Sequence, residues 1–420
     1  MERYLGADLS AGSGSALSAS ATAAVPALPN GRLFPDGPPP LSLYVHWPWC
    51  LRKCPYCDFN SHTLGDARPE LAYVDALLSD LDRELSRCDR DRPVISVFIG
   101  GGTPSLMSGP AVARLLDGIR ARTLLPPDAE VTLEANPGAV DASHFSAYRE
   151  AGVNRLSIGV QSLSAQHLEA LGRIHTPEQA KTAAVMARRS GFENINLDLM
   201  FGLPGQTLAE AAADLDAVLA LAPEHISYYQ LTLEPNTRFY QAPPALPDED
   251  LIDDMHEQGL SLLAEAGFRR YEISAFARPG WRCRHNLNYW TFGDYLGIGA
   301  GAHGKLTDAA TGQVRRRAKH RQPGTFMELA SRGLDPQSSE RMLDDADLVL
   351  EFALNAFRLV DGVGLALFEQ RTGLRSECIG SAVAGAVGDG LLTDHGGWLR
   401  PTALGLRFDN LLIGRFADWA

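Results

Sequence analysis

From Leu41 onward, short apolar segments alternate with longer segments in which apolar residues recur at helical spacing. The apolar segments predict strands at Leu43–Trp47, Val94–Ile99, Glu130–Glu134, Arg155–Val160, Asn194–Met200 and His225–Leu233. The intervening segments predict helices at Pro69–Arg87, Pro110–Arg120, Asp141–Ala151, Thr176–Arg189 and Thr207–Leu221. Alternation of this kind predicts βα units around a parallel sheet. Six strands favour an α/β fold with a partial (β/α)6 barrel over a closed eight-stranded barrel.

The predicted barrel occupies residues 41–245, and two smaller regions follow it. Residues 246–335 are expected to extend the barrel with a helix, a strand at Tyr271–Phe276 and a glycine-rich stretch at Gly293–Lys305. Residues 336–420 combine the helical pattern DADLVLEFALNAFRLV with a predicted hairpin near Leu391–Arg400. This last region is predicted to be a smaller C-terminal domain, α+β or helical and similar to a winged helix.

Residues 1–40 differ from the rest in composition, because they are rich in Ala, Ser, Gly and Pro and end in three consecutive prolines. Such a composition predicts a disordered leader, or a start codon placed too early. A transit peptide is the functional alternative. Glu2, Asp8 and Asp36 are unusual in a transit peptide, so the first interpretation is favoured.

Composition and charge narrow the class of protein. Hydrophobic residues make up 45% and charged residues 21% of the 420 residues, as in globular proteins with more than one domain. The net charge of −13 argues against general nucleic-acid binding, which needs a basic face. No uncharged apolar run is long enough to cross a bilayer, so membrane contact is expected to be peripheral at most. The six cysteines do not form the dense framework of a small secreted protein, which indicates a reducing compartment such as the cytoplasm.

Three of the cysteines, Cys50, Cys54 and Cys57, follow the first predicted strand with the spacing C-x3-C-x2-C. No fourth cysteine is near. A structural zinc site needs four ligands, whereas a 4Fe-4S cluster held by three thiolates leaves one iron open to an exchangeable ligand. A zinc site that borrows His46 or His62 as its fourth ligand is the alternative.

Other polar residues fall where predicted strands end. Cys50 follows the first strand, the run Gly100–Pro104 the second, Glu134 ends the third, Gln161 follows the fourth, and Asp198 lies late in the fifth. The active sites of parallel α/β barrels form at the carboxyl ends of the strands. The glycine run alone is weak evidence, since a tight turn needs glycine too. Together, these positions predict one site at this end of the barrel.

The stretch LSLYVHWPWCLRKCPYCDFNSH, from Leu41 to His62, resembles the radical S-adenosylmethionine (SAM) superfamily. The resemblance implies a 4Fe-4S cluster on the three cysteines whose open iron chelates the amino and carboxylate groups of SAM. The positions that match the SAM contacts of the oxygen-independent coproporphyrinogen oxidase branch are Tyr44, Tyr56, Gly101, Gly102, Thr103, Glu134, Gln161, Arg173 and Asp198. Of these, Arg173 is expected at the SAM carboxylate and Asp198 at the ribose.

Within this branch, the chain is similar to the HemW-type haem chaperones. The coproporphyrinogen III oxidases carry a further cysteine two positions past the third cluster cysteine, where this chain has Phe59. The string HNLNYW, from His285 to Trp290, matches the HNxxYW motif that the resemblance associates with haem binding. An imidazole can ligate haem iron, so His285 is the candidate haem ligand. The same string could be core, because Trp and Tyr bury large areas.

The resemblance therefore implies a haem chaperone that binds haem and a SAM-ligated 4Fe-4S cluster and passes haem to an acceptor protein, expected to be respiratory. The alternative is a radical SAM oxidase that decarboxylates coproporphyrinogen III. The basic string Arg315–Arg321 could meet haem propionates or anionic lipid, or be a solvated loop. A cytoplasmic protein with peripheral membrane encounters is expected. The sequence does not identify the electron donor.

Overall fold

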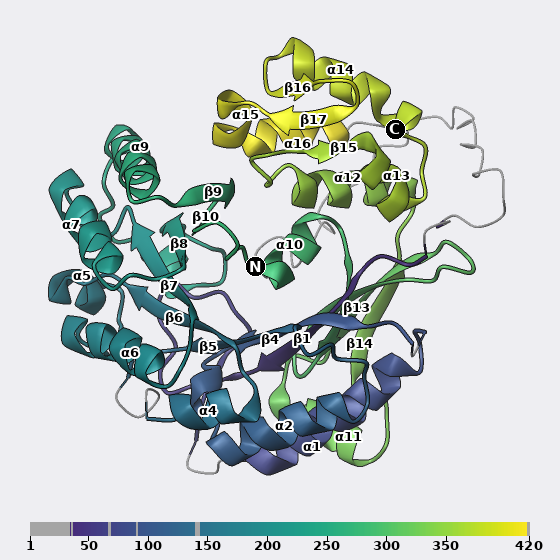
Figure 1. Cartoon of the computed structure of the whole chain (residues 1–420), viewed down its shortest axis with the longest axis horizontal. Coiled ribbons are helices and arrows are strands. Elements are labelled where there is room, and N and C mark those ends of the chain that lie inside the picture. The colour runs from purple at the N-terminus through teal and green to yellow at the C-terminus, as the bar shows by residue number, and fades with distance from the viewer. Residues whose placement is uncertain (1–33, 35–36, 66–68, 90, 139–142, 418–420) are drawn as a thin grey trace.

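The computed structural model describes residues 34, 37–65, 69–89, 91–138 and 143–417. A curved sheet forms its centre, helices cover the convex face, and a smaller C-terminal domain stands on the concave side (Figure 1). The predicted leader lies outside the described residues, apart from Phe34 and residues 37–40.

The large sheet has twelve strands in the described chain. In spatial order they are β14 (Gln337–Met342), β13 (Val314–Lys319), β12 (His303–Thr307), β11 (Asp294–Ile298), β1 (Leu41–Trp47), β4 (Val94–Gly101), β5 (Glu130–Ala135), β6 (Arg155–Gln161), β7 (Asn194–Phe201), β8 (His225–Gln230), β10 (Ala275–Ala277) and β9 (Arg269–Glu272). The strands from β11 to β8 pair in parallel, and those at both edges pair antiparallel. The predicted α/β fold and all the predicted barrel strands are confirmed.

The helices around the sheet are α1 (Glu70–Leu85), α2 (Gly109–Arg120), α4 (Phe145–Ala151), α5 (Ala165–Ala170), α6 (Pro177–Arg189), α7 (Leu208–Leu219), α8 (Arg238–Gln241), α9 (Glu249–Glu265) and α11 (Pro323–Ser331). Of these, α1, α2, α4, α6 and α7 lie close to positions predicted from the sequence. Capping boxes start α6 at Thr176 and α7 at Thr207, since each threonine side chain bonds the backbone three residues on. The start of the helix predicted at Asp141–Ala151 falls partly outside the described residues.

Alternation along the central strands separates the core from the site. On β7, Ile195, Leu197 and Leu199 pack in the main hydrophobic core with the covering helices, while Asn196 and Asp198 point to the other face. Neighbouring strands have the same pattern. The convex face therefore forms the core, and the concave face presents a layer of polar side chains.

Both sheet edges differ in detail from the predicted barrel extension. The strand predicted at Tyr271–Phe276 is two short antiparallel strands, β9 and β10, because the chain turns between them. The stretch Gly293–Lys305 contains β11 and most of the hairpin to β12. The basic string is not a solvated loop, because β13 runs through it and Lys319 is buried against Asp80 and Glu84 at 2.6 and 2.7 Å.

The C-terminal region packs around a second hydrophobic core, to which Tyr289, Trp290, Phe292, Tyr295 and Val314 also contribute. The region contains α12 (Asp345–Ala356), β15 (Val363–Gly364), α13 (Leu365–Thr372), α14 (Gly380–Gly388), β16 (Leu392–Asp394), β17 (Trp398–Pro401), α15 (Ala403–Arg407) and α16 (Asp409–Ala417). The predicted hairpin is β16–β17. Helix α10 (Arg284–Trp290) lies between this region and the concave face of the sheet (Figure 1). No helix among the described residues combines the length and the apolar character that a membrane span requires.

Candidate cluster and SAM site

The cysteine loop is tied to the carboxyl ends of β1 and β4. After β1 the chain forms β2 (Trp49–Cys50), loops outward and returns as β3 (His62–Thr63), which pairs with β2 in parallel. The backbone N–H of Gly102 donates to Trp47 O at 2.6 Å, and that of Thr103 donates to Trp49 O at 2.8 Å. The glycine run thus supports the start of the cysteine loop.

The glycines after β4 are required by close packing. A Cβ at Gly102 would lie 2.6 Å from Trp49 O, and one at Gly101 would lie 2.5 Å from the His46 ring. Gly101 also has a φ of +110°, which disfavours side chains. The Gly101 N–H donates to Glu134 Oε2 at 3.1 Å. These N–H groups are already used within the protein, so the prediction that they meet SAM would require them to exchange partners.

The three thiols lie close together in a shielded environment. Burial raises the pKa of Cys50, the nearby hydroxyls of Thr103 and Ser61 lower it in part, and the Cys54 thiol raises it further. Burial also raises the pKa of Cys57 to about 12, with Cys50 and Cys54 adding to the shift. Thiols of this kind are protonated at neutral pH and release their protons when iron binds.

A polar network leads from Cys54 across the site to Thr103. Arg173 Nη1 donates to Cys54 Sγ at 3.8 Å, and Arg173 Nη2 donates to Asn136 Oδ1 at 2.7 Å. Asn136 Nδ2 in turn donates to Thr103 Oγ1 at 3.0 Å, and Thr103 follows the glycine run that supports the start of the cysteine loop. The guanidinium of Arg173 is therefore held beside the cluster loop, where it could meet the carboxylate of SAM.

The donor set fits a 4Fe-4S cluster better than a zinc ion. In a cubane each thiolate binds a different iron, so the sulfurs do not converge on one point. Among the described residues, no three His, Cys, Asp or Glu side chains converge as ligands of one metal ion. His46, the candidate fourth zinc ligand, uses Nδ1 for Tyr44 OH and Nε2 for Asn60 O, both at 2.9 Å. His62 Nε2 contacts Arg321 O at 3.2 Å.

Two other predicted SAM contacts lie beside Arg173. Gln161 has a φ of +68° at a bulge in β6, and its Oε1 accepts from Tyr229 OH at 2.7 Å. A Cβ on Gly159 would lie 2.9 Å from Gln161 Nε2 and 3.4 Å from Arg173 Nη2. The side chains of Gln161 and Arg173 therefore both lie over Gly159. Asp198 is paired with Gly159 on the neighbouring strand. Burial raises the pKa of Asp198, and hydrogen bonds from Ser227 and Asn196 lower it only in part.

The two predicted tyrosine contacts border this group. Tyr56 lies 6.4 Å from the Phe239 ring, and burial raises its pKa well above the usual value although Arg173 lowers it. Tyr44 is on the concave face of β1, where its OH bonds His46 Nδ1 and its ring stacks on Phe98 at 6.4 Å. The structure thus gathers the predicted SAM residues around one end of the barrel.

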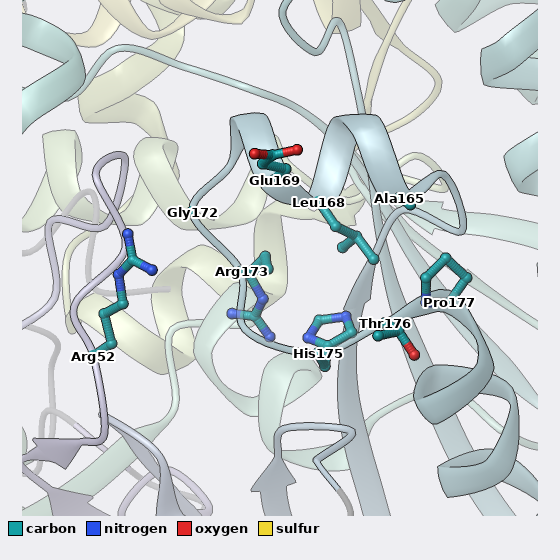
Figure 2. Close-up of a pocket in the computed structure, with 9 residues that line it drawn as sticks. All are labelled: Arg52, Ala165, Leu168, Glu169, Gly172, Arg173, His175, Thr176 and Pro177. Atoms are coloured by element: carbon teal, nitrogen blue, oxygen red, sulfur yellow. The ribbon is translucent and has the colours of Figure 1, made fainter.

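A cavity of about 440 Å³ opens beside Arg173. Figure 2 shows Arg52 of the cysteine loop on one side of it and Arg173 and His175 on the other, with Glu169 on α5 above. His175 Nε2 bonds Val160 O at 3.1 Å, and burial lowers the pKa of His175 to about 4. The polar lining of the cavity therefore includes two guanidinium groups, a neutral imidazole and the carboxylate of Glu169.

The Phe98 ring lies between the candidate haem ligand His285 and Tyr44, one of the predicted SAM contacts. His285 is completely buried on α10, its ring stacks on Phe98 at 5.0 Å, and its Nδ1 bonds Ser96 Oγ at 2.9 Å. Its Nε2 has no partner among the described residues. Burial lowers the pKa of His285 to about 3, so the imidazole is neutral. Haem ligation by His285 stays a prediction, and it would require α10 to move.

Asn136 is the site residue that the sequence analysis missed. It lies two residues beyond Glu134, on the same concave face at the carboxyl end of β5, and that spacing was the available signal. Its backbone N–H also bonds Ser105 Oγ at 3.1 Å, so its side chain is well oriented between Thr103 and Arg173.

Asn136→Ala is expected to weaken SAM binding roughly tenfold, because it removes a hydrogen bond that orients the charged Arg173. Iron and sulfide content should not change, and binding can be measured by equilibrium dialysis of the reconstituted protein. Asn194→Ala is the matched control, since Asn194 Oδ1 has no partner among the described residues. Equal SAM affinity in Asn136→Ala and wild type would remove Asn136 from the site.

Comparisons with known proteins agree with this architecture. The chain matches the radical SAM superfamily model over residues 44–218 and the HemN C-terminal domain model over residues 343–408. It is 50% identical over 378 residues to the haem chaperone HemW of Escherichia coli strain K12, covering 90% of this chain and 98% of that protein. It is 46% identical over 381 residues to HemW of Haemophilus influenzae, covering 90% and 98% of the two chains.

A solved structure shows the same fold. Coproporphyrinogen III oxidase (HemN) from Escherichia coli, a radical SAM enzyme, matches with a TM-score of 0.77 at 22% identity, over 91% of each chain. At this identity the likeness concerns the fold alone. It covers both the curved sheet and the C-terminal domain.

Proposed function

The chain belongs to the HemW family of haem chaperones, within the radical SAM superfamily, and we propose on that premise that it binds haem and transfers it to an acceptor protein. Cys50, Cys54 and Cys57 hold a 4Fe-4S cluster, and SAM occupies the coordination position that the three thiolates leave open. The single observation that carries the cofactor site is the path of hydrogen bonds from Thr103 through Asn136 and Arg173 to the thiol of Cys54.

Each side chain in this site has a task that follows from its chemistry. Arg173 pairs with the carboxylate of SAM, and Glu134 accepts from its amine or from a ribose hydroxyl. Asp198 accepts from the ribose, and Tyr56 covers the cluster side of the site. The cluster supplies a single electron when it is reduced. Burial of the Cys50 and Cys57 thiols limits the access of water to them.

His285 is the proposed haem ligand on the chain. Its Nδ1 is used by Ser96, so Nε2 is the nitrogen that can face iron, and a neutral imidazole is the form that binds metals. Because the ring is enclosed, haem entry moves α10 away from the concave face. The acceptor is expected to be a respiratory protein, met in the cytoplasm or at the membrane surface.

Three measurements on the purified, anaerobically reconstituted protein test the function. They are a haem titration, an assay of haem transfer to an apo acceptor, and an assay of coproporphyrinogen turnover. Stoichiometric haem binding and transfer without turnover is the expected result. Sustained decarboxylation of the propionates, in proportion to SAM consumed, would show an oxidase instead.

His285→Ala is expected to lower haem retention at least about tenfold while iron–sulfide absorbance stays at the wild-type level. Haem retention can be measured by absorbance after gel filtration. His256→Ala serves as the control, because His256 stacks on Phe201 of the barrel, apart from α10. Unchanged haem retention in His285→Ala would mean that another group ligates the iron.

A further inference from the structure

Exposed cations form the tip of the cluster loop. Arg52 and Lys53 lie between the ligands Cys50 and Cys54, and both side chains are exposed. Leu51 beside them is 47% exposed and adds an apolar side chain to this tip. In the part of the chain that the structure describes, no carboxylate lies within ion-pair distance of Arg52 or Lys53.

Two further arginines are held against this loop by backbone hydrogen bonds. The carbonyl oxygen of Arg321 accepts from Asn60 Nδ2 at 2.9 Å and from His62 Nε2 at 3.2 Å. Helix α8 begins at exposed Arg238, and the next backbone N–H donates to Pro55 O at 3.0 Å. Within the described residues, neither arginine has an ion-pair partner. We call Arg52, Lys53, Arg238 and Arg321 the loop cations.

The loop cations contrast with the rest of the surface. The chain has a net charge of −13, and many exposed arginines elsewhere pair with carboxylates, as Arg114 does with Asp75, although Arg189 and Arg269 have no ion pair among the described residues. The carboxylates of this region are Asp58 and Glu234, which already make interactions within the protein, and Glu169 at the cavity. The surface over the cluster is therefore positive on an acidic protein.

The cavity beside Arg173 continues this surface inward. Arg173, which the proposed function assigns to the SAM carboxylate, forms the inner wall, and exposed Arg52 forms the outer wall, where a carboxylate side chain of a partner can reach it (Figure 2). Arg173 also contacts Cys54 Sγ at 3.8 Å. A partner anchored here would lie next to a cluster ligand.

We propose that the loop cations, exposed Leu51 and the cavity between Arg52 and Arg173 form the docking surface for an acidic one-electron carrier protein. This inference rests on the proposed 4Fe-4S cluster. The positive charge of the loop cations attracts the acidic carrier to the surface next to Cys50 and Cys54, and Leu51 provides an apolar contact. One electron leaves the carrier, which is oxidised, and enters the cluster, which is reduced from the 2+ to the 1+ state.

The test compares wild type with the double variant Arg52→Glu/Lys53→Glu. The control is Arg189→Glu/Arg269→Glu, which makes the same change in net charge. Arg189 is the last residue of α6, just before β7. Arg269 pairs with Ala277, which in turn pairs with the first residue of β8. Both arginines therefore lie at the end of the sheet opposite to the cysteine loop. The acidic donor is flavodoxin hydroquinone, and the small reductant is photoreduced deazariboflavin, which is uncharged.

Stopped-flow reduction by flavodoxin is expected to fall tenfold or more in the loop variant at low salt, since charge steering changes association rates by roughly 10- to 1,000-fold. Calorimetry should show weaker flavodoxin binding by a similar factor. The control variant should match wild type in both measurements. Reduction by deazariboflavin should be equal in all three proteins.

Other outcomes overturn the inference in distinguishable ways. If both reductants act more slowly on the loop variant, the cations only balance the charge of the cluster. If flavodoxin acts equally on all proteins while binding to vesicles of anionic phosphatidylglycerol is lost in the loop variant, the surface serves a membrane instead. If wild type takes no electron from either reductant, the proposed cluster itself fails.

Discussion

Cys54→Ala is expected to abolish cluster assembly, reducing iron and acid-labile sulfide to background and SAM binding with them. Two remaining thiolates leave two irons of the cubane without protein ligands, and Arg173 Nη1 loses its contact with Cys54 Sγ. Iron and sulfide analysis after anaerobic reconstitution measures the effect. The loss should be complete rather than graded, because the cluster assembles as a unit.

Cys88→Ala is the matched control for this experiment. Cys88 is half-buried after α1, where its Sγ donates only to Leu85 O at 3.8 Å, so iron and sulfide should match wild type. A full cluster in Cys54→Ala would contradict the assignment of this loop. Zinc in place of iron and sulfide in the wild-type protein would contradict the radical SAM interpretation altogether.

Asp294→Ala is expected to reduce the free energy of unfolding by about 3–5 kcal/mol, the cost of leaving buried charges without a partner. The carboxylate is fully buried and accepts from Lys305 Nζ at 2.9 Å and Arg92 Nη2 at 2.8 Å. It also accepts from the N–H and the hydroxyl of Thr307 at 3.0 and 2.8 Å. This group joins β11 and β12 to the edge of the barrel, so its loss weakens the whole sheet.

The stability that Asp294 contributes also depends on pH. Burial acts to raise its pKa, but Lys305 and Arg92 outweigh burial and hold the pKa of Asp294 below its usual range. The contribution is therefore complete above the pKa of an unfolded aspartate, near 4, and is lost as the pH falls through the lower folded pKa.

Urea unfolding followed by circular dichroism measures both effects. The control is Asp361→Ala, which removes an exposed pair with Arg282 and should cost less than about 1 kcal/mol. The difference between the two variants should shrink in acid, where Asp294 becomes protonated. A loss below 1 kcal/mol for Asp294→Ala at neutral pH would show that the buried network is not a major source of stability.

The barrel strands and their covering helices were predicted well because their signals are local. On β7 the alternation of Ile195, Asn196, Leu197 and Asp198 marks the buried and polar faces with period two. The cysteine motif lies within eight residues, and the polar residues at strand ends follow from the parallel arrangement. Sequence neighbours alone were sufficient to place these features.

The sheet edges and α10 were beyond local reasoning. Nothing near Lys319 in the sequence shows that Asp80 and Glu84 of α1 neutralise it, so its basic string was expected to face solvent or a ligand. The HNxxYW string has the composition of either a core or a haem site, and only the packing of His285 on Phe98 and Ser96 shows that it is enclosed. Asn136 gained importance only from its distant partners.

The sequence by itself determined the α/β class, the order of the barrel elements, the cysteine triad and the family to which these motifs belong. Each depends on periodicity or spacing among residues that are close along the chain. Only the tertiary structure decided that β11 pairs with β1, that Asn136 bridges Thr103 and Arg173, and that α10 lies against the concave face. These features depend on contacts between residues that are far apart in the chain. Such contacts are determined by how whole helices and strands pack together, and no local sequence pattern specifies them.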